Sequence, residues 1–322
     1  MPSFRRRDVL AAGALALAMP REAAAAPAVR GLDPRFADVI DPAARPETIY
    51  SGGRWCEGLC PAPQLGGLVF SDVKANRISV LGPDGRARTF RDPSNNANGN
   101  ALDGAGCLVT CEHRGRRVVR REPDGGLTVL ADSFAGRPLN APNDAVLGPD
   151  GAIWFTDPVF GIRQPDEGVM AEPAQGARRV YRVSEPGRVE AMTDAADQPN
   201  GLAFAPDGRT FYLSDAGAAL QPEGARAILA LPVGPDHRLG PPRRFAELDS
   251  GAPDGLAVDR AGRLYAACED GVRVFDPDGT WLGRIATPRA AANVAFGGPE
   301  GRRLFVSAGG SIHALDLRVA GR

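Results

Sequence analysis

One pattern of hydrophobic and polar positions recurs along the chain after residue 50. Each copy consists of a polar residue with a small apolar run, a turn resembling Pro-Asp-Gly, and an apolar stretch that ends in an acidic or small polar residue. Successive copies start 39 to 57 residues apart, which is typical of a β-propeller blade of four strands. The six copies occupy residues 57–72, 98–112, 143–157, 200–215, 254–269 and 293–307.

The apolar stretches predict short β-strands, and no long segment has the periodicity of a helix. Four stretches are rich in β-branched or aromatic residues and follow turn residues: Gly67–Phe70, Ala152–Phe155, Thr210–Leu213 and Arg303–Val306. Five Pro-Asp-Gly segments predict hairpin turns, with glycine where φ must be positive: Pro83–Gly85, Pro123–Gly125, Pro149–Gly151, Pro206–Gly208 and Pro277–Gly279. We therefore predict an all-β fold, a six-bladed β-propeller with four-stranded blades around a central channel.

A sixth Pro-Asp-Gly segment, Pro253–Gly255, is out of step with the others. It falls where the other copies begin, so Asp254 belongs to the first position of its copy and is not a mere turn residue. In a propeller, residues at one position of every repeat lie at one height around the axis. The resulting first-register ring consists of Glu57, Asn98, Asn143, Asn200, Asp254 and Asn293.

This ring predicts a cation site. Two carboxylates and several amide oxygens make an oxygen-only site whose charge of −2 matches a divalent cation. We expect Ca²⁺, which takes about six to eight oxygen ligands at flexible geometry, with Zn²⁺, Mn²⁺ or Mg²⁺ as alternatives. The alternative is that Asn and Asp recur only as turn formers at strand ends. That alternative does not explain why every position is polar and two are acidic.

Composition removes several classes of function. The 322 residues include 38 Lys+Arg and 39 Asp+Glu, and a net charge of −1 argues against a nucleic-acid partner. The chain has a single lysine, Lys74, which excludes a Walker A loop, and its three histidines do not form an HExxH zinc motif. Neither GxSxG nor GxGxxG occurs. The common motifs of hydrolases and nucleotide-binding enzymes are therefore missing.

The N-terminus resembles a twin-arginine export signal over residues 1–26. Arg5-Arg6 precede an apolar run from Val9 to Met19 and the alanines that end at Ala26. A run of this length is shorter than the roughly 20 residues that span a bilayer, so we expect no stable membrane insertion after signal removal. The predicted partner is the twin-arginine export machinery and the predicted location the periplasm; an uncleaved N-terminal anchor is the alternative. An N-terminal extension, 27–47, and the propeller, 48–322, would follow.

Five cysteines would then enter an oxidising compartment. We expect Cys56 and Cys60 to lie in a Pro/Gly loop, where they either form a local disulfide or are buried as small hydrophobic residues. Cys107 and Cys111 fall within one predicted strand, about 13 Å apart, which is too far for a disulfide.

Five phrases in order at the repeat spacing resemble the gluconolactonase and regucalcin family of six-bladed propeller lactonases: Trp55–Gly58, Leu139–Asp144, Trp154–Pro158, Gln198–Leu202 and Pro253–Leu256. The resemblance runs from about residue 48 to the C-terminus. It is strongest to the bacterial branch, through Thr110–His113 and Asn293–Gly298. Relatives usually have Glu-Gly-Pro in the first blade, whereas this chain has Glu57-Gly58-Leu59-Cys60-Pro61. We therefore expect a differently shaped loop at Glu57.

The resemblance implies Glu57, Asn200 and Asp254 as metal ligands, with Asn143 as a metal or substrate ligand. It also implies hydrolysis of a sugar lactone, such as glucono-1,5-lactone or a pentonolactone, to the aldonic acid. The metal would act as a Lewis acid on the lactone carbonyl. Asp254 would activate water or attack directly. Asn143 would steady the substrate oxygen, and Asp144 would add a hydrogen bond.

Further polar residues flank the predicted ring. We expect Asn98, His113 and Asp157 to contact substrate, although His113 at a strand end is also consistent with simple hydrogen bonding. Four acids at the far end of the other copies are expected to join blades: Asp72, Glu112, Asp215 and Glu269. Substrate specificity is expected in the loops 161–178 and 216–226.

Other functions remain compatible with this fold, because a fold does not dictate a reaction. A calcium-dependent phosphotriester or aryl-ester hydrolase could use the same ring. A periplasmic propeller could also bind a sugar without turnover, with calcium only closing the channel. A quinone-dependent sugar dehydrogenase is disfavoured, because no cationic pocket with His and Lys is evident in the sequence.

Overall fold

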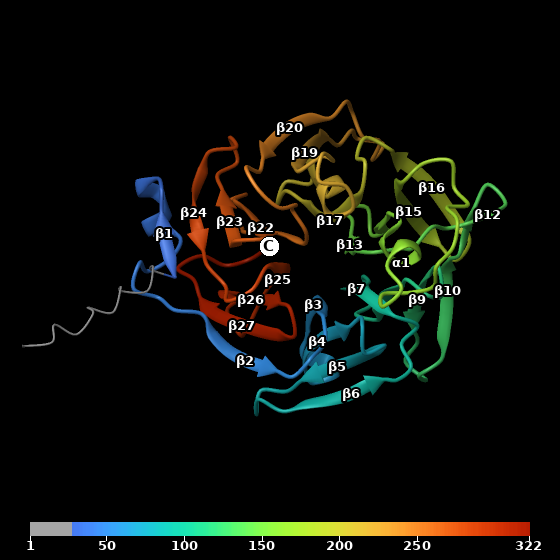
Figure 1. Cartoon of the computed structure of the whole chain (residues 1–322), viewed down its shortest axis with the longest axis horizontal. Helices are drawn as coiled ribbons and strands as arrows, with labels where there is room; N and C mark the ends of the chain where they lie inside the picture. The colour runs from blue at the N-terminus through green and yellow to red at the C-terminus, as the bar shows by residue number, and fades with distance from the viewer. Residues whose placement is uncertain (1–27) are drawn as a thin grey trace, which may run out of the picture.

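The repeated apolar stretches form the blades of a six-bladed β-propeller, as predicted (Figure 1). This computed structural model describes residues 28–322. The predicted export signal, 1–26, lies outside the described residues. In Figure 1 the blades surround a central axis, and labelled innermost strands such as β3, β7, β17 and β25 lie nearest to it.

Each of the first five blades contributes four antiparallel strands in chain order from the axis outward. Blade one contains β3 (Cys56–Ala62), β4 (Gly67–Asp72), β5 (Arg77–Leu81) and β6 (Ala87–Arg91). Blade two contains β7 (Ala97–Leu102), β8 (Leu108–Glu112), β9 (Arg117–Arg121) and β10 (Leu127–Ala131). Blade three contains β13 (Ala145–Leu147), β14 (Ile153–Asp157), β15 (Arg179–Glu185) and β16 (Arg188–Thr193).

The second half of the chain repeats this arrangement. Blade four contains β17 (Pro199–Phe204), β18 (Thr210–Asp215), β19 (Ala227–Pro232) and β20 (Arg243–Glu247). Blade five contains β21 (Leu256–Val258), β22 (Leu264–Cys268), β23 (Gly271–Phe275) and β24 (Trp281–Ile285). Blade six contains β25 (Ala291–Gly297), β26 (Arg303–Ala308), β27 (Ser311–Asp316) and, outermost, β2 (Glu47–Ser51). The ring of blades is therefore closed by a strand from the beginning of the chain.

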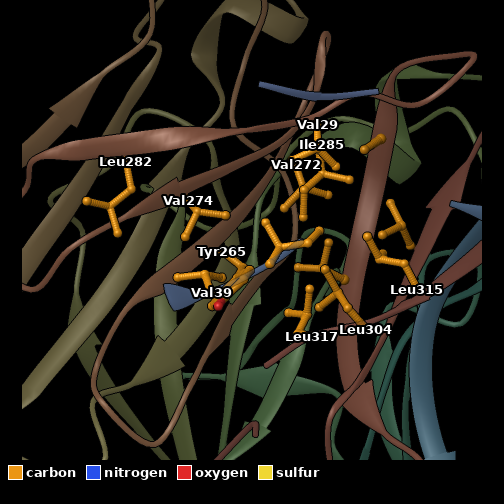
Figure 2. Close-up of a cluster of buried hydrophobic side chains, with 14 of the residues drawn as sticks. Val29, Val39, Tyr265, Val272, Val274, Leu282, Ile285, Leu304, Leu315 and Leu317 are labelled. Carbon is orange, nitrogen blue, oxygen red and sulfur yellow. The ribbon is translucent and has the colours of Figure 1, made fainter. Parts of the chain in front are cut away.

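The segment before β2 packs on the side of the propeller. β1 (Val29–Gly31) pairs with β24 as a fifth strand of blade five. The short 3₁₀ turn η1 (Pro34–Asp38) follows, and Val39 is fully buried. Figure 2 shows Val29 and Val39 in the cluster that also contains Leu282 of blade five and Leu304 of blade six. Burial of such side chains stabilises the fold by about 1.5–3 kcal/mol each, which binds this segment to the two blades.

The elements between the blade strands are short. They are a two-stranded ribbon, one helical turn and two further 3₁₀ turns: β11 (Ser133–Phe134), β12 (Arg137–Pro138), α1 (Phe160–Arg163), η2 (Pro63–Leu65) and η3 (Gly217–Ala219). Within the described part of the chain no helix has the length and apolar character needed to cross a membrane.

The predicted strands and turns are confirmed. The four apolar stretches lie in β4, β14, β18 and β26, each the second strand of its blade. The five Pro-Asp-Gly segments form hairpin turns, in which the glycine φ lies between 68° and 93°. The aspartate accepts a hydrogen bond from the N–H two residues later in each turn. These turns join the first and second strands in blades three and four, and the third and fourth strands in blades one, two and five.

The prediction that Cys56 and Cys60 lie in a loop is wrong, because both belong to β3. All five cysteines of the chain lie within residues 28–322 and are free thiols, four of them buried. The cysteines therefore follow the alternative in which they fill space as small hydrophobic residues.

Candidate functional site

The first-register residues meet where the six innermost strands begin. These strands, β3, β7, β13, β17, β21 and β25, contact one another in turn around the axis. Five of the six ring residues are only 4–7% exposed, and Asp254 is partly exposed. The ring predicted from the repeat register is therefore present as a buried polar collar.

A β-bulge lies beside the ring residue in four blades. In blade one the pairing with β4 shifts between Glu57 and Cys60, so the first strand carries one residue more than its partner. Blades two, four and six have corresponding shifts. A bulge re-aims side chains that the regular pleat would turn to the other face. The expected loop at Glu57 is thus a bulged strand in which Gly58 has φ 56°.

Glycines after the ring residues let the innermost strands approach one another. A Cβ atom at Gly58 would lie 2.0 Å from the carbonyl oxygen of Asn98. A Cβ atom at Gly201 would lie 2.2 Å from the carbonyl oxygen of Asp254. The Leu59 N–H donates to Asn293 Oδ1 at 3.3 Å and joins blade six to blade one. The Asn-Gly pattern of the sequence therefore serves a close backbone approach.

Two acids of the ring, the buried Glu57 and the partly exposed Asp254, have no counter-charge. Burial raises the pKa of Glu57 well above its usual range, and the charges of Asp254, Asp144 and Glu167 raise it further. Burial also raises the pKa of Asp254, while a hydrogen bond from Asn200 lowers it. Among residues 28–322, no arginine, lysine or histidine forms an ion pair with either acid. The ring thus concentrates negative charge that the protein itself does not neutralise.

His113 lies beside two amides of the first-register ring and is fully buried. Its Nε2 atom is 3.3 Å from Asn98 Nδ2 and 3.4 Å from Asn143 Nδ2, and its Nδ1 atom is 3.0 Å from the Glu167 carbonyl oxygen. Burial lowers the pKa of His113 to about 4, so its imidazole is neutral near pH 7. Of the two predicted possibilities for His113, substrate contact or simple hydrogen bonding, the structure shows hydrogen-bond contacts with two ring amides and the Glu167 carbonyl.

Asp144 follows Asn143, at the place that glycine takes after Glu57, Asn98, Asn200 and Asp254. Its Oδ1 atom accepts the Ala145 N–H at 2.9 Å, and its backbone N–H donates to Thr156 Oγ1. Burial raises the pKa of Asp144 to about 7. Its charge acts on both ring acids, which is consistent with the position predicted for it beside the site.

Two residues near the site were not predicted. Glu167 lies in the segment between α1 and β15, and Lys74 Nζ is 3.6 Å from its Oε1 atom. Lys74 also lies over the ring of Trp55, 5.0 Å from its centroid. The prediction that the loop 161–178 sets specificity included Glu167 but did not name it as a site residue. The fact that Lys74 is the only lysine was the one available signal.

The structure corrects the role of Asp157. Its carboxylate is fully buried and accepts the N–H groups of Asn140 and Ala141, both at 2.8 Å. Burial raises the pKa of Asp157 to about 7, although these hydrogen bonds lower it. Both oxygens hold the connection that enters blade three, so Asp157 is not positioned to bind substrate.

Asp157 belongs with the far-end acids, the acidic residues that end the second strands of the blades. Asp72 accepts the N–H groups of Arg54 and Trp55, and Asp215 does the same for residues 197 and 198. Glu112 pairs with Arg91 and Arg117, both at 2.7 Å. These acids join blades, as predicted. Glu269 is the exception, because its side chain is exposed.

The ring residues fit a hard divalent cation. In the described part of the chain, no group of three or more His, Cys, Asp or Glu side chains is arranged to hold a metal. The ring instead combines two carboxylates that lack an ion-pair partner with amides, and such oxygen donors suit calcium or magnesium better than zinc. The charge that lacks a partner is what a bound cation would neutralise.

Comparisons with known proteins agree with this architecture. The SMP-30/Gluconolactonase/LRE-like region matches residues 55–310. A gluconolactonase of Zymomonas mobilis is 28% identical over 307 residues, which cover 89% of this chain and 85% of that protein. A solved gluconolactonase structure from Xanthomonas campestris is 38% identical with a TM-score of 0.83, and the match covers 90% of this chain and 94% of that chain.

A more distant likeness concerns the fold alone. The structure of a calcium-binding regucalcin from Agrobacterium tumefaciens has a TM-score of 0.70 at 24% identity, and it covers 85% of this chain and 94% of that chain. The matched region of the first comparison includes all six ring residues, from Glu57 to Asn293. The chain therefore belongs to the SMP-30/gluconolactonase/LRE-like family.

Proposed function

We propose that this lactone hydrolase opens a sugar lactone to its aldonic acid with a divalent cation, calcium first, held by the first-register ring. The observation that carries the proposal is the acid pair Glu57 and Asp254, which lacks a counter-charge and belongs to a ring whose other members are amides. The relatives named gluconolactonase support the substrate class. The oxygen donors of the ring, carboxylates and amides, support calcium as the ion.

Glu57, Asn143, Asn200 and Asp254 would hold the cation through their side-chain oxygens. When bound, the cation supplies Lewis-acid polarisation of the lactone carbonyl. The Asn200 amide hydrogen-bonds the Asp254 carboxylate and so fixes its orientation. Without the cation, the negative charges of Glu57 and Asp254 would repel each other.

Asp254 is the residue that we assign to proton transfer. It is the only partly exposed member of the ring and can therefore meet water from the channel mouth. Its carboxylate would take the proton of the water that attacks the carbonyl carbon. Asn143 would orient the substrate oxygen, and the neighbouring Asp144 would add a hydrogen bond. The reaction consumes one water and releases the hydroxy acid.

Glu167 and Lys74 support a role of the 161–178 loop in substrate choice. Glu167 is 8% exposed, and its charge acts on both ring acids. Its ion pair with Lys74 links a loop of blade three to a turn of blade one. We propose that the loops 161–178 and 216–226 set substrate scope.

We also propose that residues 1–26 direct the protein to the periplasm.

The test is release of acid from glucono-1,5-lactone and a pentonolactone, followed with a pH indicator above the spontaneous rate. The protein is assayed as purified, after EDTA, and after single additions of Ca²⁺, Mg²⁺, Mn²⁺ and Zn²⁺. We expect activity to disappear with EDTA and to return with calcium. Full activity after complete removal of metal would contradict the cation. If the protein hydrolyses aryl esters or phosphotriesters but not lactones, it is an ester hydrolase that uses the same ring. If it binds calcium but hydrolyses none of these substrates, it is a binding protein.

A further inference from the structure

His113 is held in one orientation by its surroundings. It lies directly after β8, is fully buried, and its ring lies against Gly161, where a Cβ atom would come within 2.5 Å of His113 Cβ and Cγ. Its Nδ1 atom is 3.0 Å from the carbonyl oxygen of Glu167. A carbonyl oxygen only accepts hydrogen bonds, so Nδ1 carries the hydrogen. The neutral ring then has a lone pair, and no hydrogen, on Nε2.

That lone pair faces two amides of the first-register ring. Nε2 is 3.3 Å from the Nδ2 atom of Asn98 and 3.4 Å from the Nδ2 atom of Asn143. Because Nε2 only accepts, both amides turn their NH₂ groups toward the histidine. Their Oδ1 atoms lie on the opposite side of each planar amide. One imidazole therefore sets the orientation of two neighbouring ring residues.

Amide orientation decides whether these residues attract or repel a cation. The two ends of a carboxamide have nearly the same shape, so rotation about its terminal torsion costs little unless a hydrogen bond prevents it. An oxygen presents negative charge to a cation, whereas an NH₂ group presents positive charge. A ring with both amides reversed would lose the oxygen that Asn143 offers to the cation and the oxygen that Asn98 offers to the substrate, without losing its fold.

We propose that His113 is a positioning residue that orients the amides of Asn98 and Asn143, so that the Asn143 oxygen is available to the cation and the Asn98 oxygen to the substrate. That a cation binds at the ring rests on the proposed function. The Glu167 carbonyl completes the arrangement, because it selects the tautomer that leaves Nε2 free to accept. The 161–178 loop is thereby connected to the ring through one side chain: the Glu167 carbonyl, the imidazole and the two amides.

Two substitutions separate this role from simple anchoring of the loop. In H113Q the Gln Oε1 atom can reach the position of Nε2 and accept from the amides, but the donor to Glu167 is lost. In H113N the Asn Nδ2 atom can replace Nδ1 as donor to Glu167, but nothing reaches the amides. Calcium affinity is measured by isothermal titration calorimetry on the wild type and both variants. Urea unfolding without calcium measures their intrinsic stability.

We expect H113Q to bind calcium within about 3-fold of the wild type and H113N to bind about 10- to 100-fold more weakly, the range typical of residues that orient metal ligands. The opposite order would show that His113 only anchors the loop and would overturn the proposal. Equal affinity in all three proteins would overturn it as well.

A second measurement does not depend on metal binding. Long-range ¹H–¹⁵N NMR of the three histidines reports which nitrogen of His113 carries the hydrogen. We expect the Nδ1–H tautomer in the metal-free protein. The Nε2–H tautomer would overturn the proposal even if calcium binds. If the tautomer is Nδ1–H and the wild type binds no divalent ion, the proposed cation fails and the orientation of the amides stands.

Discussion

Each blade buries polar side chains at two levels, and the two levels treat acids differently. At the far end, Asp215 accepts the N–H groups of residues 197 and 198 at 2.9 and 3.0 Å. At the ring, the partly exposed Asp254 lies close enough to Asp144 and Glu167 to be affected by their charges, and it has one hydrogen bond from Asn200. Both are aspartates at recurring positions of the same repeat. Only the far-end aspartate has its charge compensated by the protein.

The difference shows how to separate structural acids from functional ones. Removing a carboxylate from water costs several kcal/mol unless hydrogen bonds or opposite charges replace the lost hydration. Asp215 and Asp72 receive backbone N–H groups, and Glu112 receives two arginines. Glu57 and Asp254 receive much less and sit beside further carboxylates. A carboxylate charge that the protein does not compensate is stable in such a place only if a cation or another group from outside the chain supplies the compensation.

The largest effect is expected from Asp254→Asn. The substitution removes the proposed proton acceptor and one charge of the ring, so kcat/KM on a lactone should fall about 10²- to 10⁴-fold. The metal-free protein should keep or gain stability, because an unpaired buried charge is lost. Acid release and urea unfolding measure the two effects. Full activity in this variant would contradict the mechanism.

Gly58→Ala should distort the ring more than an equivalent change elsewhere. Gly58 has φ 56°, and an added Cβ would lie 2.0 Å from the Asn98 carbonyl oxygen. We expect a loss of about 3 kcal/mol or more in the free energy of unfolding, together with weaker calcium binding. Gly85→Ala is the matched control, since Gly85 has φ 74° but an added Cβ would meet no atom within 4 Å. Its loss should be about 1 kcal/mol, and similar losses in both variants would show that close strand approach is unimportant.

Asp215→Asn should produce the reverse of Asp254→Asn. The amide can accept one of the two N–H groups but sets its own NH₂ against the other. We expect urea unfolding to show a loss of about 1–3 kcal/mol, while kcat/KM of the folded protein changes only a few-fold. A large loss of activity at unchanged stability would place this far-end acid in the chemistry and remove the distinction between the two levels.

The smallest effect concerns pH and Asp157. Its pKa is raised to about 7 in the folded protein from a usual value of 3.8, so the folded state holds a proton that the unfolded state has released between these values. The stability that this proton provides is fully present below about pH 4 and is lost as pH rises through about 7. Urea unfolding of calcium-saturated wild type and Asp157→Asn from pH 4 to 8 should differ by a slope of at most about 1.4 kcal/mol per pH unit. Parallel curves would show that the two hydrogen bonds keep Asp157 ionised.

The repeat register identified which six residues come together as the ring, because a propeller converts sequence period into angular position. The out-of-step Asp254 was recognised from the chain alone, since its Pro-Asp-Gly stands where other copies begin. Asp157 was misassigned because an acid that ends a strand looks the same whether its oxygens face the channel or receive backbone N–H groups. Glu167 was missed because it belongs to no repeat, and only the path of its loop brings it to the ring.

The sequence by itself determined the number of blades, the positions of the hairpin turns and the identity of the six ring residues. These features depend on local turn chemistry and on a period that repeats along the chain. Only the tertiary structure decided which acids are compensated, that Cys56 and Cys60 lie within a bulged strand, and that His113 meets Asn98 and Asn143. Each of these depends on atoms from separate strands or blades that meet only when the ring closes, and no local pattern encodes such distances.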